Sequence, residues 1–89
     1  ALYYRGMIYD SKEKRNEAIA DLKQAYNLNK DFTICNYIIA SDYDALGKFN
    51  DAYKYYSAYA NSNVEDDEYK QYAKARAEEL KKYATPANK

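Results

Sequence analysis

The side chains that could carry out catalysis or hold a metal are few in this 89-residue chain. Histidine, the commonest general base and metal ligand, does not occur in the sequence. The single cysteine, Cys35, lies in an apolar segment and has no basic neighbour in sequence, which favours a buried structural thiol over a reactive one. A single cysteine also excludes an internal disulfide framework and a cysteine-based zinc site.

Two acidic pairs remain as candidates for a cation site, namely Asp42 with Asp44 and Asp66 with Asp67. Calcium sites use oxygen-rich loops that contain glycine, whereas both pairs fall in segments with a helical pattern. We therefore interpret them as a solvated helix face or a helix N-terminus. No glycine-rich phosphate-binding loop occurs either. The sequence predicts a non-enzymatic protein with no cofactor and no metal site.

Composition narrows the class of partner. Fourteen basic and fourteen acidic residues give a formal net charge of zero, which argues against nucleic acid because phosphate binding needs a basic face. The apolar runs are too short to span a membrane, so we predict no membrane insertion. The chain begins without an initiator methionine or a signal segment, and we expect it to derive from a longer or processed protein. The compartment, cytoplasm or cell envelope, stays open.

Part of the sequence recurs at an offset of 34 residues. The identical pairs are Tyr3/Tyr37, Tyr9/Tyr43, Asp10/Asp44, Lys14/Lys48, Asn16/Asn50, Ala18/Ala52, Asn27/Asn61 and Asn29/Asn63. A fixed period of this length is typical of repeat arrays, in which each unit buries its apolar face by stacking on the next. The period therefore predicts two copies of one structural unit.

The spacing of apolar residues predicts that each unit is a pair of helices. We expect helices that begin at N-caps Asn16, Asp31 and Asn50, and a turn at Gly47. A further helix follows the acidic residues 66–68 and has one narrow apolar stripe, as the end of a solenoid requires for solubility.

The fold class predicted is thus all-α, with about five helices arranged as antiparallel helix–turn–helix repeats and a capping helix. A single domain should span residues 1–84. We place the first repeat at about 1–31, the second at about 32–64 and the capping helix at about 65–84. Residues 85–89 should form a flexible tail.

This pattern resembles the tetratricopeptide repeat, which reads W-x2-L-G-x2-Y, then A-x3-F, then P. In the first unit those places hold Leu2, Arg5, Gly6, Tyr9, Ala18, Leu22 and Lys30. In the second unit they hold Asn36, Ile39, Ala40, Tyr43, Ala52, Tyr56 and Val64. The small residue, the tyrosine and the alanine match in both units. The tryptophan and the proline are absent from both, and Arg5 stands at an apolar place.

The resemblance implies a protein-interaction module or scaffold that binds a peptide or partner protein in a concave groove lined by the first helix of each pair. Carried over to this chain, the groove residues are Tyr3, Met7, Asp10, Ile34, Tyr37, Ile38, Ser41 and Asp44. Such a groove should prefer peptides with apolar or aromatic anchors flanked by Lys or Arg. Alternatively, Tyr3 and Tyr37 serve only in packing between helices. The Lys, Arg and Asn clamp that grips chaperone C-termini is absent, because Tyr3, Met7 and Ile38 stand at those places.

Two other functions are alternatives for this sequence. The chain could be the C-terminal regulatory segment of a larger enzyme, such as a peptidyl-prolyl isomerase, and the upstream sequence would decide this. An RNA-binding helical repeat is disfavoured by the zero net charge and by Asp10 and Asp44 on the expected inner face.

Repeat arrays of this kind usually need about three units. Further repeats, the final helix, or association of copies through the exposed repeat ends should therefore complete the core.

Overall fold

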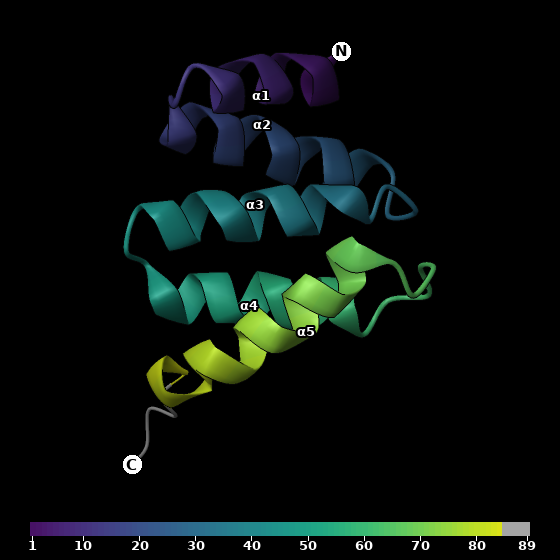
Figure 1. Cartoon of the computed structure of the whole chain (residues 1–89). Helices are drawn as coiled ribbons and strands as arrows, with labels where there is room; N and C mark the ends of the chain where they lie inside the picture. Colours follow the sequence, from purple (N-terminus) through teal and green to yellow (C-terminus); the bar gives the residue numbers. More distant parts are fainter. Residues whose placement is uncertain (85–89) are drawn as a thin grey trace.

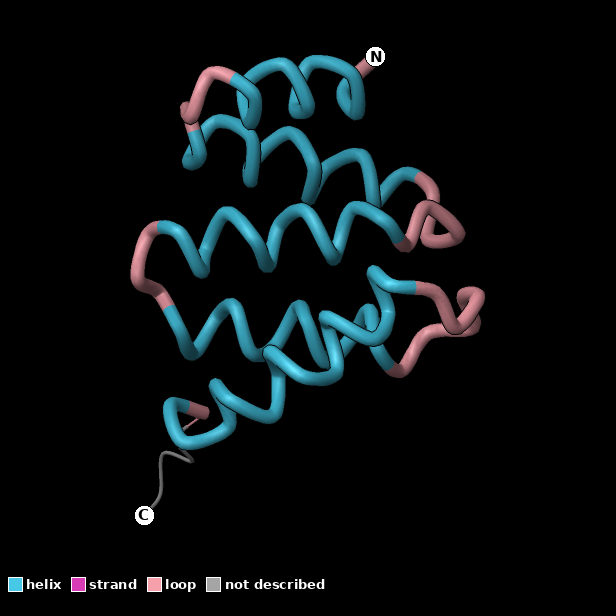
Figure 2. Tube along the Cα trace, viewed as in Figure 1, coloured by secondary structure: helices cyan, strands magenta, loops and turns pink. Residues whose placement is uncertain are grey.

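The computed structural model of the chain describes residues 1–84, and all regular structure among them is helical (Figures 1 and 2). The helices are α1 (Leu2–Ser11), α2 (Arg15–Leu28), α3 (Ile34–Ala45), α4 (Phe49–Ala60) and α5 (Glu68–Leu80), followed by the short 3-10 helix η1 (Lys81–Tyr83). The predicted all-α class with five helices and no strand is confirmed for these residues. The tail expected at 85–89 lies outside the described residues.

The first four helices form one row in which each runs antiparallel to the next (Figure 1). The helix pair α1–α2 is followed by the pair α3–α4, and α5 crosses α4 obliquely at the end of the row (Figures 1 and 2). This is the predicted arrangement of two helix–turn–helix units closed by a capping helix. Among residues 1–84, no helix has the length and apolar character needed to cross a bilayer.

The 34-residue period recurs in the backbone of the two tight turns. The Lys14 N–H donates to the Tyr9 carbonyl, and the Lys48 N–H donates to the Tyr43 carbonyl, both over 2.9 Å. Before each of these lysines the chain adopts a left-handed conformation, with φ of 60° at Glu13 and 78° at Gly47. The predicted turn at Gly47 is confirmed. In the first unit a residue with a side chain takes the same conformation.

Replacing Glu13 by glycine should stabilise the protein. A left-handed conformation costs a residue with a Cβ about 1–2 kcal/mol, from which the greater unfolded-state entropy of glycine must be subtracted. We expect Glu13→Gly to raise the free energy of unfolding by about 0.5–1 kcal/mol in urea denaturation followed by circular dichroism. Gly47→Glu is the mirror substitution and should destabilise, because glutamate is strained at a φ of 78°. A Cβ at this position meets no atom within 4 Å, so no steric clash adds to the effect. Equal stability of both variants and the parent would contradict this reading of the turns.

The expected N-caps of α2 and α4 are wrong. These helices begin at Arg15 and Phe49, one residue before Asn16 and Asn50, and their N-cap lysines make no side-chain capping bond. The physical reason is the tight turn, which is closed by the lysine N–H and sends the next residue directly into the helix. The two asparagines therefore lie inside the first helical turn.

The expected cap Asp31 is also wrong, because α3 begins three residues later, at Ile34. Asp31 belongs to the α2–α3 connection, where its N–H donates to the Asn29 side-chain oxygen over 3.0 Å. The acidic start of α5 is confirmed: Asp67 is its N-cap and accepts a hydrogen bond from the Lys70 N–H over 3.0 Å. An aspartate cap satisfies one otherwise unpaired backbone donor of the first turn.

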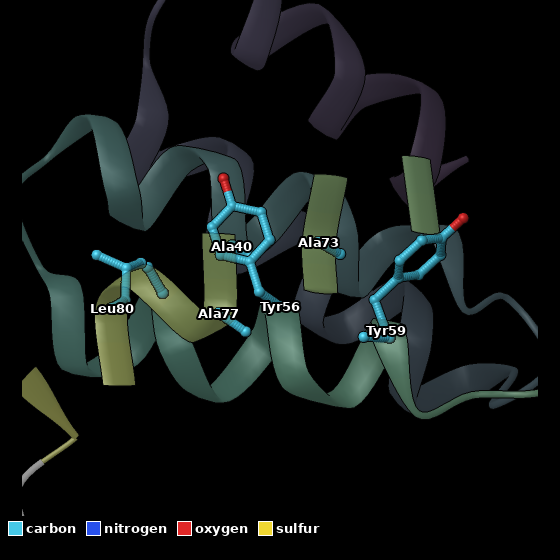
Figure 3. Close-up of a cluster of buried hydrophobic side chains, with 8 residues drawn as sticks. Ala40, Tyr56, Tyr59, Ala73, Ala77 and Leu80 are labelled. Atoms are coloured by element: carbon cyan, nitrogen blue, oxygen red, sulfur yellow. The ribbon is translucent and has the colours of Figure 1, made fainter. Parts of the chain in front are cut away.

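The core consists of two clusters that meet at α3. The cluster between α3, α4 and α5 combines small residues with buried rings (Figure 3). Its buried members are Ala40, Ala52, Tyr56, Tyr59, Ala60, Ala73, Ala77 and Leu80. The cluster between α2 and α3, against which α1 packs, contains Ala18, Ile19, Leu22, Ala25, Cys35, Ile38 and Ile39. Small residues facing large ones let the helices approach closely and fix how they cross.

The closest approach of α1 and α2 is at Gly6, the buried small residue of α1. A Cβ at this position would lie 2.9 Å from Leu22 Cγ and 3.4 Å from Asp21 Cβ. Glycine is therefore required here by space, whereas at Gly47 it is favoured by the left-handed backbone conformation.

Candidate binding cavity and the ion pairs around it

A cavity of about 330 Å³ opens between α1, α3 and α5. Its lining is aromatic and aliphatic, and it consists of Tyr3, Met7, Ile34, Tyr37, Ile38 and Tyr69. The other cavities compared on the described part of the chain each include Lys or Arg in their lining. Among these five cavities of the described residues, the one at α1, α3 and α5 is therefore best suited to an apolar group.

Helical spacing brings these side chains to one place. Tyr3 and Met7 are four residues apart on α1, so they share a face of that helix. On α3, Ile34 is three residues from Tyr37 and four from Ile38, which also places these three on one face. Tyr69, in the first turn of α5, completes the lining.

Tyr37 belongs to both the cavity and the packing of α5 on α3. Its ring centroid lies 5.5 Å from that of Tyr59, 5.3 Å from Tyr69 and 6.3 Å from Tyr72. Burial raises the pKa of the Tyr37 hydroxyl above its ordinary value, so the ring stays neutral. Tyr3 is likewise half-buried, with its ring 4.3 Å from Phe32. Both tyrosines thus serve in packing and line the cavity.

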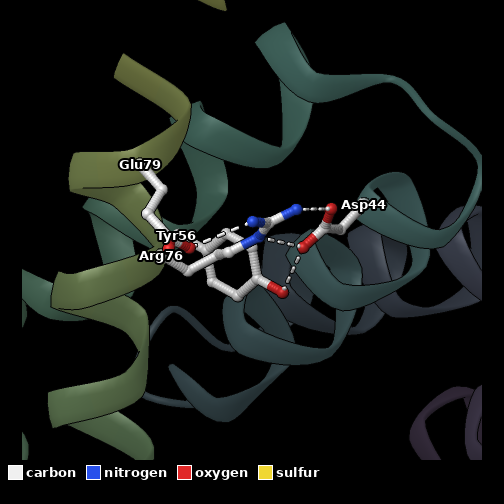
Figure 4. Close-up of polar contacts among 4 residues, drawn as sticks. All are labelled: Asp44, Tyr56, Arg76 and Glu79. Atoms are coloured by element: carbon white, nitrogen blue, oxygen red, sulfur yellow. Dashed lines mark hydrogen bonds and ion pairs between the residues drawn. The ribbon is translucent and has the colours of Figure 1, made fainter. Parts of the chain in front are cut away.

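Asp44 does not line this cavity but forms an ion pair with α5 (Figure 4). The Arg76 guanidinium donates to both Asp44 oxygens over 2.7 Å, and the Tyr56 hydroxyl donates to Asp44 Oδ2 over 3.2 Å. Arg76 also donates to Glu79 over 3.0 Å. The hydrogen bonds from Arg76 hold the pKa of the Asp44 carboxyl below its ordinary value. This carboxylate is matched by a cation of the capping helix.

Asp42 faces the opposite end of the array from Asp44 and is fully buried. Its Oδ1 accepts a hydrogen bond from Arg15 of α2 over 3.0 Å. The same Arg15 nitrogen lies 3.8 Å from Asp10 Oδ1, so the Asp10 carboxylate of α1 faces this arginine and lies outside the apolar cavity. The interpretation of Asp42 and Asp44 as a solvated face is therefore wrong. A helix places residues two apart on different faces, and here each face meets an arginine.

A third arginine explains the departure from the apolar pattern at Arg5. Its guanidinium donates to both Asp21 oxygens, over 2.7 and 2.9 Å, and so joins α1 to α2. The equivalent residues of the second unit, 34 positions later, are Ile39 and Tyr55, which line one cavity together. An ion pair in the first unit thus replaces an apolar pair in the second.

Cys35 is a buried structural thiol, as predicted, with no exposed surface. Burial raises the pKa of its thiol to about 11, so the nucleophilic thiolate is scarce at neutral pH. The described residues contain no group of three or more Asp, Glu, Cys or His that could hold a metal ion.

Five of the eight predicted groove residues line the apolar cavity. They are Tyr3, Met7, Ile34, Tyr37 and Ile38. Ser41 is exposed outside the cavity lining, and Asp10 and Asp44 face arginines. Sequence reasoning missed Tyr69 as a lining residue. The Tyr69 ring is half-exposed, and no sequence signal distinguishes a tyrosine that lines a cavity from one that packs α5 against the core.

Comparison of the chain with known protein families, curated proteins and solved structures found no match. The repeat fold, the apolar cavity and the charges around it are therefore the features from which a function can be inferred.

Proposed function

We propose that this protein is a non-catalytic protein-interaction module that binds a peptide segment of a partner through the cavity between α1, α3 and α5. The resemblance to tetratricopeptide repeats belongs to this proposal, because it places Tyr3 and Tyr37 on the inner helices. The observation that supports it best is the cavity itself, which no charged side chain lines. The peptide would insert a large apolar or aromatic side chain.

The size and lining of the cavity suit that ligand. Ligand pockets in proteins span about 300–1,000 Å³, and a volume of about 330 Å³ lies at the lower end of this range. Tyrosine rings supply a large contact area with little loss of conformational entropy, and methionine adapts to irregular shapes. An anchor held between Tyr37, Tyr69 and Met7 would therefore carry most of the binding energy.

The partner's flanking residues should be basic, although Asp10 and Asp44 do not supply the attraction. Those carboxylates face arginines, whereas residues 65–68 are four consecutive exposed acidic residues directly before Tyr69. The nearby Lys70 amine is turned to the backbone, where it donates to the Val64 carbonyl over 3.1 Å. The acidic segment 65–68 would thus attract Lys or Arg at the edge of the cavity.

The test is a peptide-array screen followed by fluorescence-anisotropy titration of the selected peptides. Tyr69→Ala and Tyr37→Ala should each weaken binding about tenfold or more, which corresponds to about 1.4 kcal/mol. Because Tyr37 also packs against α5, circular dichroism must show that this variant keeps its fold. Tyr69 is 54% exposed, so its removal should leave the fold intact.

Tyr72→Ala is the matched control. Tyr72 is 49% exposed on the same helix and contacts Tyr37, yet it does not line the cavity. Its removal should change affinity by less than about threefold, since it takes no anchor contact. Affinity that is insensitive to Tyr69→Ala and Tyr37→Ala, or equally sensitive to Tyr72→Ala, would contradict binding at this cavity.

The acidic segment gives a separate prediction. The double change Asp66→Asn with Glu68→Gln should slow association with basic-flanked peptides and reduce the salt dependence of the association rate. Asp67 is left in place because it caps α5. Asp51→Asn, an exposed charge in the first turn of α4, is the control and should leave the rate unchanged. Selection of acidic peptides in the screen would exclude this role for the segment.

A further inference from the structure

Asp42 is the one fully buried carboxyl in the described chain whose second oxygen has no donor. Its Oδ1 accepts the hydrogen bond from Arg15, but Oδ2 is buried and receives none from residues 1–84. An ionised oxygen left unpaired in the interior is costly, because its lost hydration is not replaced. The Asp10 carboxyl of α1 is the acidic neighbour of Asp42 and faces the same arginine nitrogen, but an ionised carboxylate cannot donate a hydrogen bond to another.

Arg15 alone does not satisfy the two acids. Its Nη1 is 3.0 Å from Asp42 Oδ1 but 3.8 Å from Asp10 Oδ1, too far for a good hydrogen bond. Two carboxyls beside one guanidinium carry a net charge of −1 when both are ionised. One proton would allow Asp42 to donate a hydrogen bond to Asp10 and would make the cluster neutral.

We propose that Asp10 and Asp42 share one proton, and that the shared proton is a pH-sensitive latch between the first helix pair and α3. Each of its three groups comes from a different helix: Asp10 from α1, Arg15 from α2 and Asp42 from α3. Loss of the proton leaves two adjacent carboxylates with one cation, and their repulsion pushes α1 away from α3.

The surroundings of Asp42 set the direction of the pH effect. Within residues 1–84, the charged groups that act on it are Asp10 and Arg15. α4 contributes none, and Arg76 of α5 is bound by Asp44 instead. Burial and the neighbouring Asp10 raise the pKa of the Asp42 carboxyl to about 7, against the opposing effect of Arg15. The folded protein therefore holds a proton that the unfolded chain releases near its ordinary pKa, about 3.9.

The sign follows from this difference. The stabilisation is fully present below the unfolded pKa and is lost as pH rises through the folded pKa. Between about pH 4 and about pH 7 the unfolding constant should rise up to tenfold per pH unit from this group alone, since one proton is released on unfolding. Asp44 acts in the opposite sense, because its lowered pKa gives stability that is lost on acidification.

The latch also bears on the cavity, an extension that depends on the proposed function. Asp10 follows Met7 by three residues on α1, and Asp42 follows Ile38 by four on α3, so latch and cavity lie one turn apart on the same two helices. Separation of α1 from α3 would spread the cavity lining. Peptide affinity should therefore fall as pH rises through the titration of the pair.

The experiment is a titration of the carboxyl ¹³C shifts of Asp10 and Asp42 by NMR in the full chain without peptide. We expect the Asp42 carboxyl to titrate well above the ordinary aspartate value, near pH 7, as the upper step of the pair. Asp42→Asn keeps the shape of the protonated acid and should remove the upper step. The parent chain should have a lower thermal midpoint at pH 7.5 than at pH 5, and this difference should become smaller in Asp42→Asn. Asp44→Asn is the control and should leave the upper step in place.

Should Asp42→Asn not fold, Asp10→Asn tests the same pair, since it removes the acceptor and should lower the pH of the upper step. Ordinary aspartate titration of both carboxyls in the parent chain would overturn the latch, as would an upper step that survives Asp42→Asn. A confirmed upper step with peptide affinity independent of pH would leave the latch standing and remove its link to the cavity. Absence of any peptide ligand would count against the proposed function alone.

Discussion

A chain that ends at Asn63 should aggregate or lose its cooperative unfolding transition. Removal of α5 exposes the face of α4 that carries Tyr56 and Tyr59, both buried in the complete chain. It also removes Arg76 and leaves the Asp44 carboxylate without its cation. An exposed apolar face at the end of a repeat array promotes association, which is why such arrays carry caps. Size-exclusion chromatography and thermal circular dichroism measure both effects.

Single substitutions separate docking of α5 from its other roles. Leu80 is 2% exposed at the end of α5, so Leu80→Ala should cost about 2–4 kcal/mol of unfolding free energy. Leu28→Ala makes the same chemical change at a side chain that is 75% exposed and should cost little. A soluble 63-residue chain as stable as the parent, or equal effects of the two leucine changes, would mean that α5 is an arm and not part of the core.

The second large effect is expected at Gly6. A Cβ there already lies 2.9 Å from Leu22 Cγ, so the side chain of leucine would force α1 and α2 apart. Gly6→Leu should lower the free energy of unfolding by about 1–3 kcal/mol despite the better helix propensity of leucine. Ala52→Leu should act similarly in the second unit, because Ala52 has no exposed surface.

Ala20→Leu is the control for these variants, since Ala20 lies on the exposed side of α2. It should leave the free energy of unfolding within about 0.5 kcal/mol of the parent value. A neutral Gly6→Leu variant would show that the helices of the first pair do not approach as closely as described.

The helices were predictable because they follow from local patterns. The repeat at 34 residues located both helix pairs, and Gly47 marked the turn between α3 and α4. Helix starts were less predictable, because Glu13 adopts a left-handed conformation without the glycine that would signal it. That conformation, and not the capping preference of Asn16, decides where α2 begins.

The ion pairs could not be predicted, since they depend on how distant segments meet. Asp42 and Asp44 look like one acidic pair in sequence, yet one faces Arg15, 27 residues earlier, and the other faces Arg76, 32 residues later. The apolar part of the cavity was predictable from the resemblance to tetratricopeptide repeats, which implies that the first helix of each pair lines a groove. The charges around it were not, because a cation from another helix can neutralise any of them.

The buried thiol of Cys35 gives the protein a built-in reporter of its own opening. Cys35 is the single cysteine of the sequence, lies between α2 and α3, and has no exposed surface. A thiol reagent can therefore modify it only in molecules that have opened at that junction. The labelling rate is thus proportional to the fraction of open molecules. Burial raises the pKa of the thiol to about 11 in the folded protein. In the open state the thiol has its ordinary pKa, and the labelling rate must be corrected for the thiolate fraction at that pKa. Opening of the junction between the two repeat units can thus be measured without introducing a probe.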